Sequence, residues 1–429
     1  MPTLKIPAWL IKTIAFLLAA ATPFLVFATG VFVPLKNDDA DAVLRMTDGF
    51  MRGMCHVEMN DNDMNDALDM NVEWVREDIL LPLNSDGAVN DKFVYWTKYF
   101  LSLYKQKGFK ILAVTPGITD FLSAGIDPRT DEGKKTVRET ARFIAEEYAG
   151  IYADAIQVAN EIGVDRFTAP LTTEEGAEFI GIQLEEMDAI CDSKKVPLSY
   201  NLGGMGILQL PKYMKPYNKY VDFVGADIYV GSFEPIVHDI DANFVILNYC
   251  RSVTKKPIVI TEFGYIGLGE PKTDEEKKEV LKEYGFESED EARKDIDTLI
   301  SRLPETMRDN FIKLHGDESD EEKGNQMFNG EYSNHLYREL SDGIELKGYR
   351  HTPVGEARFF RYLIPRFAEY KYVVGEFVYE LRDADKCYFC GQENCPVETG
   401  WGMVDGDGNR KPSFYAVQEE YAKIKESGR

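Results

Sequence analysis

The sequence predicts a (β/α)8 (TIM) barrel, and three observations support this fold class. Eight apolar, β-branched segments recur along the chain, and amphipathic stretches with apolar residues at three- and four-residue spacing lie between them. This alternation indicates right-handed βαβ units and a parallel sheet. Eight such units in a chain of 429 residues fit a closed barrel. A doubly wound open sheet is the alternative, but no G-x-G-x-x-G or Walker-type loop follows any of the segments.

The predicted strands are spaced so that most intervals have room for a helix. Stretches such as DKFVYWTKYFLSLYKQKG and KKTVRETARFIAEEYAG carry the apolar stripe of an amphipathic helix. Segments rich in β-branched and aromatic residues supply the strands. The eight strand candidates are residues 49–58, 72–79, 109–117, 155–162, 196–204, 221–231, 256–265 and 372–381.

The N-terminus carries an uncharged apolar run that is separate from the barrel. Residues 13–33 follow Lys5 and Lys12, and about 20 apolar residues match the thickness of a bilayer core. We expect a transmembrane anchor here, with residues 1–12 cytoplasmic and the barrel outside the cytoplasm by the positive-inside rule. A cleaved signal sequence, which would give a secreted protein, and a buried helix are the alternatives. A polar linker is expected over residues 34–48.

The composition restricts the possible partners. A formal net charge of −24 disfavours nucleic acid and anionic membrane surfaces as ligands, because polyanions are repelled. An apolar fraction of 44% is sufficient for a large core. We therefore expect contact with a membrane only through the N-terminal segment.

One interval is too long for the barrel pattern. The barrel is expected over residues 49–425, and within it residues 268–351 follow the seventh strand. Loops of this length without secondary structure are uncommon, and segments such as EEKKEVLKEYG have helical patterns. Residues 271–345 carry a net charge of −11. We expect an inserted acidic helical lobe between strand seven and helix seven, overhanging the barrel mouth as decoration, as a lid or as a wall of a substrate cleft.

Two glutamates stand where predicted strands end. Glu161 closes the fourth strand candidate and Glu262 lies near the end of the seventh. In a closed barrel the carboxyl ends of all strands meet at one mouth, so the two side chains should converge there. Two facing carboxylates are what cleavage of a glycosidic bond needs, one as acid and one as nucleophile or base. Adjacent strand residues point to opposite faces, so Asn160 and Glu161 can both face the mouth only if the strand ends or bulges there.

Five short motifs together resemble the clan-A glycoside hydrolases, the retaining (β/α)8 group that includes the cellulase- and mannanase-like, family 5-like enzymes. They are VANEIG after the fourth strand, ITEFGY in the seventh, EWVREDI in the second, GADIY in the sixth and the closing stretch GWGMVDGDGNRKPSFYAVQ. The resemblance covers residues 49–267 and 352–425. It implies a retaining hydrolase of β-linked sugars, with an oligo- or polysaccharide substrate and no cofactor.

The resemblance also implies roles for individual residues. Glu262 would be the nucleophile and Glu161 the acid/base, while Asn160 would bond the 2-hydroxyl of the sugar. Arg76 would lie beside the nucleophile and keep it ionised, and Tyr229 would hydrogen-bond it. A salt bridge of Arg76 with a neighbouring acid, and ordinary rim packing of Tyr229, are the structural alternatives.

Two aromatic side chains complete the predicted sugar site. Tyr379 in GEFVYEL stands where the family carries a tryptophan platform, and an aromatic face there can stack on a sugar. His56, near the end of the first strand, could line the same site or have a purely structural role.

Three cysteines in KCYFCGQENCP follow the eighth strand without an evident catalytic role. Cys387, Cys390 and Cys395 could form a disulfide in an oxidising compartment or bind zinc with a fourth ligand. Because strand one neighbours strand eight in a closed barrel, Cys55 or His56 could complete either arrangement. Free thiols are the third possibility.

Two other functions stay open. A catalytically inactive carbohydrate-binding barrel would keep the aromatic residues without a paired acid and nucleophile. A metal-dependent barrel hydrolase is disfavoured, because the five histidines are scattered and none forms an H-x-H pair.

Overall fold

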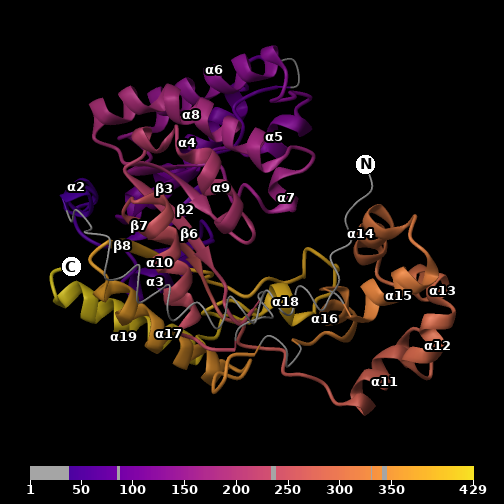
Figure 1. The fold of residues 1–429 in the computed structure, drawn as a ribbon. Coiled ribbons are helices and arrows are strands. Elements are labelled where there is room, and N and C mark those ends of the chain that lie inside the picture. The colour runs from indigo at the N-terminus through magenta and orange to yellow at the C-terminus, as the bar shows by residue number, and fades with distance from the viewer. Residues whose placement is uncertain (1–37, 85–86, 233–237, 330, 341–344) are drawn as a thin grey trace.

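A computed structural model describes residues 38–84, 87–232, 238–329, 331–340 and 345–429 (Figure 1). Eight parallel strands form one closed barrel in sequence order, and the first strand pairs with the eighth. Each strand lies within one of the predicted segments, so the barrel prediction is confirmed. The strands are β1 (Met51–Cys55), β2 (Trp74–Asp78), β3 (Lys110–Val114), β4 (Ala155–Val158), β5 (Leu198–Leu202), β6 (Phe223–Ile228), β7 (Ile258–Phe263) and β8 (Val373–Val378).

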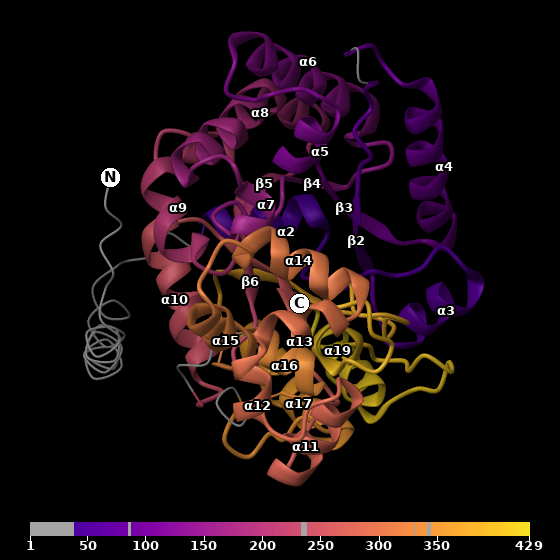
Figure 2. The same cartoon turned by 90° about the vertical axis from the view of Figure 1, so that its right-hand side faces the viewer.

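Helices cover the outside of the barrel (Figures 1 and 2). Side-chain caps define where several of them begin; for example, Thr172 and Glu175 form a reciprocal capping box at the start of the longest one. The longer covering helices are α3 (Asp61–Asp69), α4 (Asp91–Lys107), α6 (Asp131–Tyr148), α8 (Thr173–Lys194), α9 (Gly206–Met214), α10 (Ala242–Thr254), α17 (Pro353–Glu369) and α19 (Pro412–Glu426). Shorter helices lie in the loops: α5 (Ile118–Ser123), α7 (Asp165–Thr168), η1 (Asn218–Tyr220) and α18 (Pro396–Thr399).

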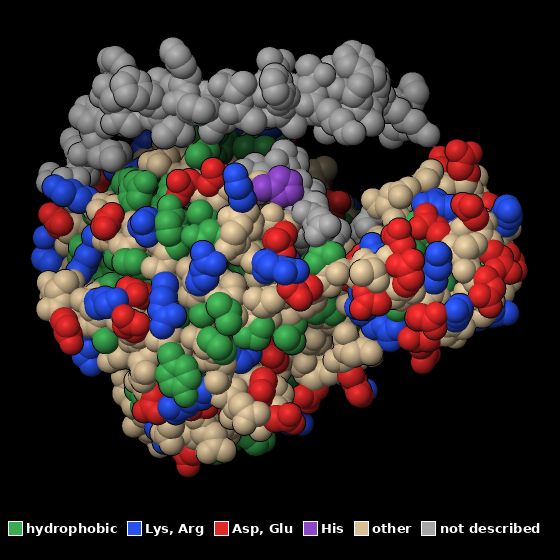
Figure 3. Space-filling view, turned by 90° about the horizontal axis from the view of Figure 1, so that it is seen from below, with side chains coloured by type: hydrophobic (Ala, Val, Ile, Leu, Met, Phe, Trp, Pro, Cys, Tyr) green, Lys and Arg blue, Asp and Glu red, His purple; other side chains and the backbone are tan. Residues whose placement is uncertain are grey.

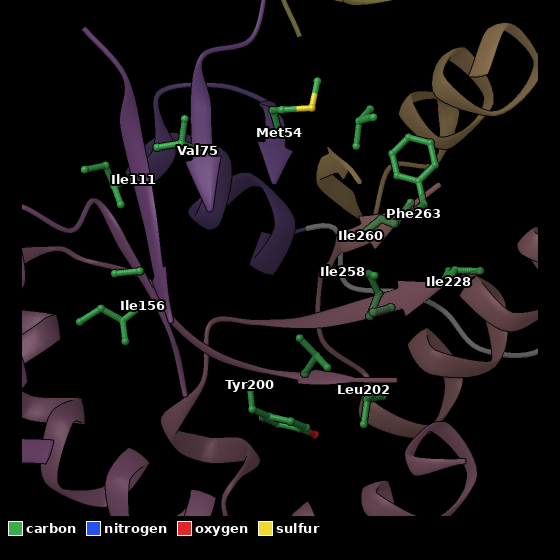
Figure 4. Close-up of a cluster of buried hydrophobic side chains, with 14 of the residues drawn as sticks. Met54, Val75, Ile111, Ile156, Tyr200, Leu202, Ile228, Ile258, Ile260 and Phe263 are labelled. Carbon is green, nitrogen blue, oxygen red and sulfur yellow. The ribbon is translucent and has the colours of Figure 1, made fainter. Parts of the chain in front are cut away.

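The main core lies between the strands and these helices (Figure 4). Outward-facing strand residues such as Ile111, Ile156 and Ile258 are fully buried there, and each contributes about 1.5–3 kcal/mol by leaving water. The barrel interior is filled separately, with Trp74 and Phe377 among its largest side chains. All strands are thus fixed on both faces, which holds their carboxyl ends rigidly at the mouth.

The predicted linker is in part helical. Residues 38–47 form α2 (Asp38–Thr47), whose Ala40 and Val43 are buried in the same cluster as the barrel-interior side chains. This part of the predicted linker is therefore an ordered helix, because apolar residues at i and i+3 give it a face to bury. In Figure 1 this helix lies on the opposite side of the barrel from helices α11–α16.

The predicted membrane segment, residues 13–33, lies outside the described residues. None of the helices in the described ranges is both long enough and apolar enough to cross a membrane.

Between β7 and α17 the chain forms a helical lobe, which we call the acidic lobe. In Figure 2 this lobe lies in front of the barrel, and acidic side chains gather over its surface in Figure 3. Its buried core is continuous with Tyr229 and Trp401 at the barrel mouth. The lobe is therefore packed against the end of the barrel where the strands terminate. Its helices are α11 (Asp274–Glu283), α12 (Glu289–Lys294), α13 (Ile296–Arg302), α14 (Glu305–His315), α15 (Asp320–Asn329) and α16 (Glu331–Tyr337).

Candidate active site

The carboxyl ends of the strands bring the predicted polar residues to one mouth. Arg76 lies in β2, Asn160 and Glu161 follow β4, Tyr229 follows β6, and Glu262 is the penultimate residue of β7. These residues come from strands around the whole barrel, yet hydrogen bonds link them into one network.

Both oxygens of the Glu262 carboxylate accept a hydrogen bond. Arg76 Nη1 donates to Oε1 over 2.7 Å, and the phenol of Tyr229 donates to Oε2 over 2.5 Å. Burial and the charge of Glu262 raise the pKa of Tyr229 well above its ordinary value, so the phenol stays protonated and acts as the donor. Glu262 is only 7% exposed. The carboxylate is thus held in one orientation at the base of the mouth.

The guanidinium of Arg76 connects three strands. Its Nε donates to Gln157 Oε1 over 3.2 Å, and its Nη2 donates to Asn160 Oδ1 over 2.7 Å. Burial lowers the pKa of Arg76, but the charges of Glu262 and Asp227 outweigh burial, so the net pKa rises and the cation is permanent. Arg76 therefore pairs with Glu262 instead of forming the alternative salt bridge with a neighbouring acid.

The end of β4 has an unusual backbone that presents Glu161 to the mouth. The strand stops at Val158, and Ala159 and Glu161 both have positive φ, at 57° and 44°. Such values are uncommon for residues with a side chain and concentrate at functional sites. The expectation that the strand must end or bulge at Asn160 and Glu161 is confirmed.

Asn201, at the carboxyl end of β5, links the backbone of Glu161 to the side chain of Asn160. Its Oδ1 accepts from the backbone N–H of Glu161 over 2.9 Å, and its Nδ2 donates to Asn160 Oδ1 over 2.8 Å. Because Asn160 Oδ1 also accepts from Arg76, a continuous path of hydrogen bonds joins Glu161 to Glu262.

Asp227 lies at the centre of the network and is not among the predicted site residues. Its carboxyl accepts from Asn201 over 2.6 Å and from Thr261 over 2.5 Å. The register between β6 and β7 shifts between Ala226 and Asp227, so that Asp227 pairs with Glu262. Burial, together with the charges of Glu262 and Glu161, raises the pKa of Asp227 well above its ordinary value. A carboxylate inside an otherwise apolar strand was the signal that could have revealed it.

An aromatic wall lies beside Glu262. The ring of Tyr379, half-buried after β8, packs edge-to-face on Tyr229 and Trp401 with centroids 5.8 and 5.6 Å away. His56 also contacts Tyr379, at 5.1 Å, and its Nδ1 lies 3.3 Å from Glu380 Oε2. The predicted Tyr379 and His56 are therefore both at the mouth, and Glu380 is a further titratable group beside them.

The three predicted metal-binding or disulfide cysteines lie together in the loop after β8. Neither Cys55 nor His56 completes this cluster: Cys55 is buried in the barrel and contacts the carbonyl oxygen of Thr261, while His56 pairs with Glu380. That expectation is wrong, because the acidic lobe supplies the fourth group, His335. All six cysteines are free and buried.

No family model matches the chain. No curated protein matches it either. Solved structures that match include a GH2 beta-galacturonidase from Eisenbergiella tayi bound to galacturonate (14% identity, TM-score 0.48, 87% of this chain and 51% of that chain). A second match is a beta-glucuronidase from Bifidobacterium dentium complexed with coumarin-3-O-glucuronide (11% identity, TM-score 0.49, 87% of this chain and 46% of that chain). A third is a beta-glucuronidase from Faecalibacterium prausnitzii (15% identity, TM-score 0.49, 88% of this chain and 49% of that chain).

The chain spans about half the length of these three solved chains. Similarity at this level does not imply a shared function.

Proposed function

We propose that the protein is a retaining glycoside hydrolase that cleaves β-linked glycosidic bonds in an oligo- or polysaccharide. The observation that carries this proposal is the doubly held carboxylate of Glu262, with Arg76 on one oxygen and Tyr229 on the other. Glu161 stands at the same mouth on the far side of the hydrogen-bond network. Double displacement needs two carboxyl groups in different environments, because one must be an ionised nucleophile and the other a protonated acid.

In the first step an oxygen of Glu262 attacks the anomeric carbon while the bond to the leaving oxygen breaks. Glu161 gives its proton to that oxygen, and a covalent glycosyl-enzyme remains. In the second step the ionised Glu161 takes a proton from water, and the water oxygen displaces Glu262 from the anomeric carbon. Arg76 and Tyr229 stabilise the Glu262 carboxylate before attack and after release.

Asn160 is suited to hold the sugar. Its Oδ1 is engaged by Arg76 and Asn201, so the amide orientation is fixed. That orientation leaves Nδ2 as the group that can donate to a sugar hydroxyl. Tyr379, which packs against Tyr229 at the same mouth, supplies an aromatic ring for stacking on a sugar.

A screen of aryl β-glycosides and β-linked polysaccharides tests the proposal. We expect turnover of at least one substrate, its loss in Glu262→Ala under the same conditions, and in Glu161→Ala a loss that depends on the leaving group. The competing function, an inactive carbohydrate-binding barrel, predicts polysaccharide binding without turnover.

We also propose that this activity is located outside the cytoplasm, on the basis of the apolar residues 13–33. N-terminal sequencing of the mature protein distinguishes an anchor from a cleaved signal sequence. An intact N-terminus supports the anchor, whereas a mature chain that starts near Thr29 supports secretion.

A further inference from the structure

Four metal-binding side chains meet between the acidic lobe and the loop that follows β8. His335 comes from α16, and Cys387, Cys390 and Cys395 come from the loop. Their ligand atoms all lie within 4.8 Å of one another, and all four residues are buried. Residues far apart in sequence thus converge on a point enclosed by protein.

The distances within this cluster fit a tetrahedral zinc site. His335 Nδ1 lies 3.3 Å from Cys395 Sγ and 3.6 Å from Cys387 Sγ. Zn–S bonds of about 2.3 Å and Zn–N bonds of about 2.0 Å at tetrahedral angles place nitrogen and sulfur ligands about 3.5 Å apart. These two nitrogen-to-sulfur distances therefore match those of a tetrahedral zinc site.

The loop also has the groups that orient metal ligands. Gln392 Nε2 lies 3.3 Å from Cys390 Sγ and 3.0 Å from the carbonyl oxygen of His335. The N–H of Gly391 donates to the carbonyl oxygen of Cys387, which closes the turn between the first two cysteines. Gly391 has a φ of +74°, a conformation that glycine adopts without strain. Hydrogen bonds to ligand groups of this kind are a common feature of metal sites.

We propose that His335, Cys387, Cys390 and Cys395 bind one structural zinc ion that fastens the acidic lobe to the barrel. Four protein ligands fill a tetrahedral shell, so the site has no open position for catalysis. A disulfide explains the cluster less well, because it would use two sulfurs and leave the third cysteine and His335 buried without a role. Three thiolates and one imidazole are a donor set typical of zinc.

The loop with the three cysteines also contacts the loop that follows β4 at the barrel mouth. Tyr388 lies between Cys387 and Cys390, and its ring centroid is 4.7 Å from the guanidinium carbon of Arg166. The hydroxyl of Tyr388 accepts a hydrogen bond from Arg166 and donates one to Glu398. Arg166 belongs to the loop after β4, which also carries Glu161. If the proposed glycosidase function holds, zinc therefore shapes one side of the substrate cleft.

The test is the metal content of the full-length protein, purified without a metal-affinity step. We expect about one zinc per chain, and a sharp drop in His335→Ala and Cys390→Ser. His335→Cys should keep zinc, because four thiolates also form a closed site. Cys191→Ser, which removes a buried thiol in α8 far from the cluster, is the matched control and should keep zinc.

A second measurement does not depend on the folding of any variant. Wild-type protein in which cobalt(II) replaces zinc should show the thiolate charge-transfer band and the intense visible bands of a tetrahedral site. Substoichiometric zinc, iron in its place, or a disulfide among the three cysteines in non-reduced protein would overturn the proposal. Because none of these readouts is enzymatic, they separate this inference from the glycosidase function.

Discussion

The backbone of Gly203, just after β5, lies directly against the carboxyl group of Glu161. A Cβ atom on Gly203 would lie 2.0 Å from Glu161 Oε1, much closer than any real contact. The backbone of Gly203 has no positive φ, so alanine can adopt it. The absence of a side chain at this position therefore determines where the proposed acid/base sits.

Gly203→Ala should displace the Glu161 side chain while the barrel stays folded. We expect kcat to fall by about 100-fold, the effect of a misplacement of about 1 Å, with a melting temperature close to that of the parent. Gly406→Ala is the control, because nothing lies within 4 Å of its added Cβ. Equal activity of the two variants would show that the close contact has no catalytic importance.

Glu262→Ala should lower kcat by more than about 1,000-fold, since it removes the nucleophile. Azide should restore activity, because a small anion can attack from the side that the carboxylate vacated. The product is then a glycosyl azide of inverted configuration, which NMR identifies. Glu262→Gln keeps the size of the side chain and should be inactive without azide. A Glu262→Ala variant with substantial unassisted turnover would contradict the nucleophile role.

Glu161→Ala should affect substrates according to their leaving groups. A poor leaving group needs the proton, so its turnover should fall by about 100- to 10,000-fold. A good leaving group, such as dinitrophenolate, departs unaided, so its first step should persist as a burst while the glycosyl-enzyme accumulates. Stopped-flow measurement of phenolate release checks this. Equal losses for both classes of substrate would argue against acid catalysis by Glu161.

The protein should be more stable at about pH 5 than at about pH 8. Burial raises the pKa of Glu380 from 4.5 to about 8, with the charges of Asp383, Glu398 and Glu262 adding to the effect and Lys411 opposing it. Between these values the folded state holds a proton that the unfolded state has lost, so stability falls as the pH rises. Burial raises the pKa values of Glu77 and Glu356 to about 8 as well, with the same sign.

Thermal denaturation across this range, in the parent and in Glu380→Gln, measures that contribution. The variant cannot titrate at this position, so its melting temperature should fall less steeply with pH. An identical slope in the two proteins would exclude Glu380 as a source of the pH dependence.

The barrel was predictable because its strands are short, apolar and β-branched, and because helices with clear periodicity separate them. The site glutamates were predictable for a related reason. In a parallel barrel a polar residue at the carboxyl end of a strand lies at the mouth, so its position along the strand is enough to locate it without knowing its contacts. Glu161 and Glu262 were found in this way.

Residues that act through long-range contacts could not be found so easily. Asn201 and Asp227 matter because of neighbours on adjacent strands, and the register shift beside Asp227 has no signature in the sequence. His335 is 52 residues from Cys387, in a lobe whose docking onto the barrel depends on tertiary packing. Only the fold could identify it as the fourth member of the cysteine cluster.

The stereochemistry of the first-formed product tests the central claim most directly. For a β-linked substrate found in the screen, proton NMR follows the anomeric signal during hydrolysis before mutarotation. Double displacement through Glu262 predicts that the β-anomer appears first, because two inversions restore the configuration. Initial release of the α-anomer would mean a single displacement by water and would contradict the assignment of Glu262 as a nucleophile.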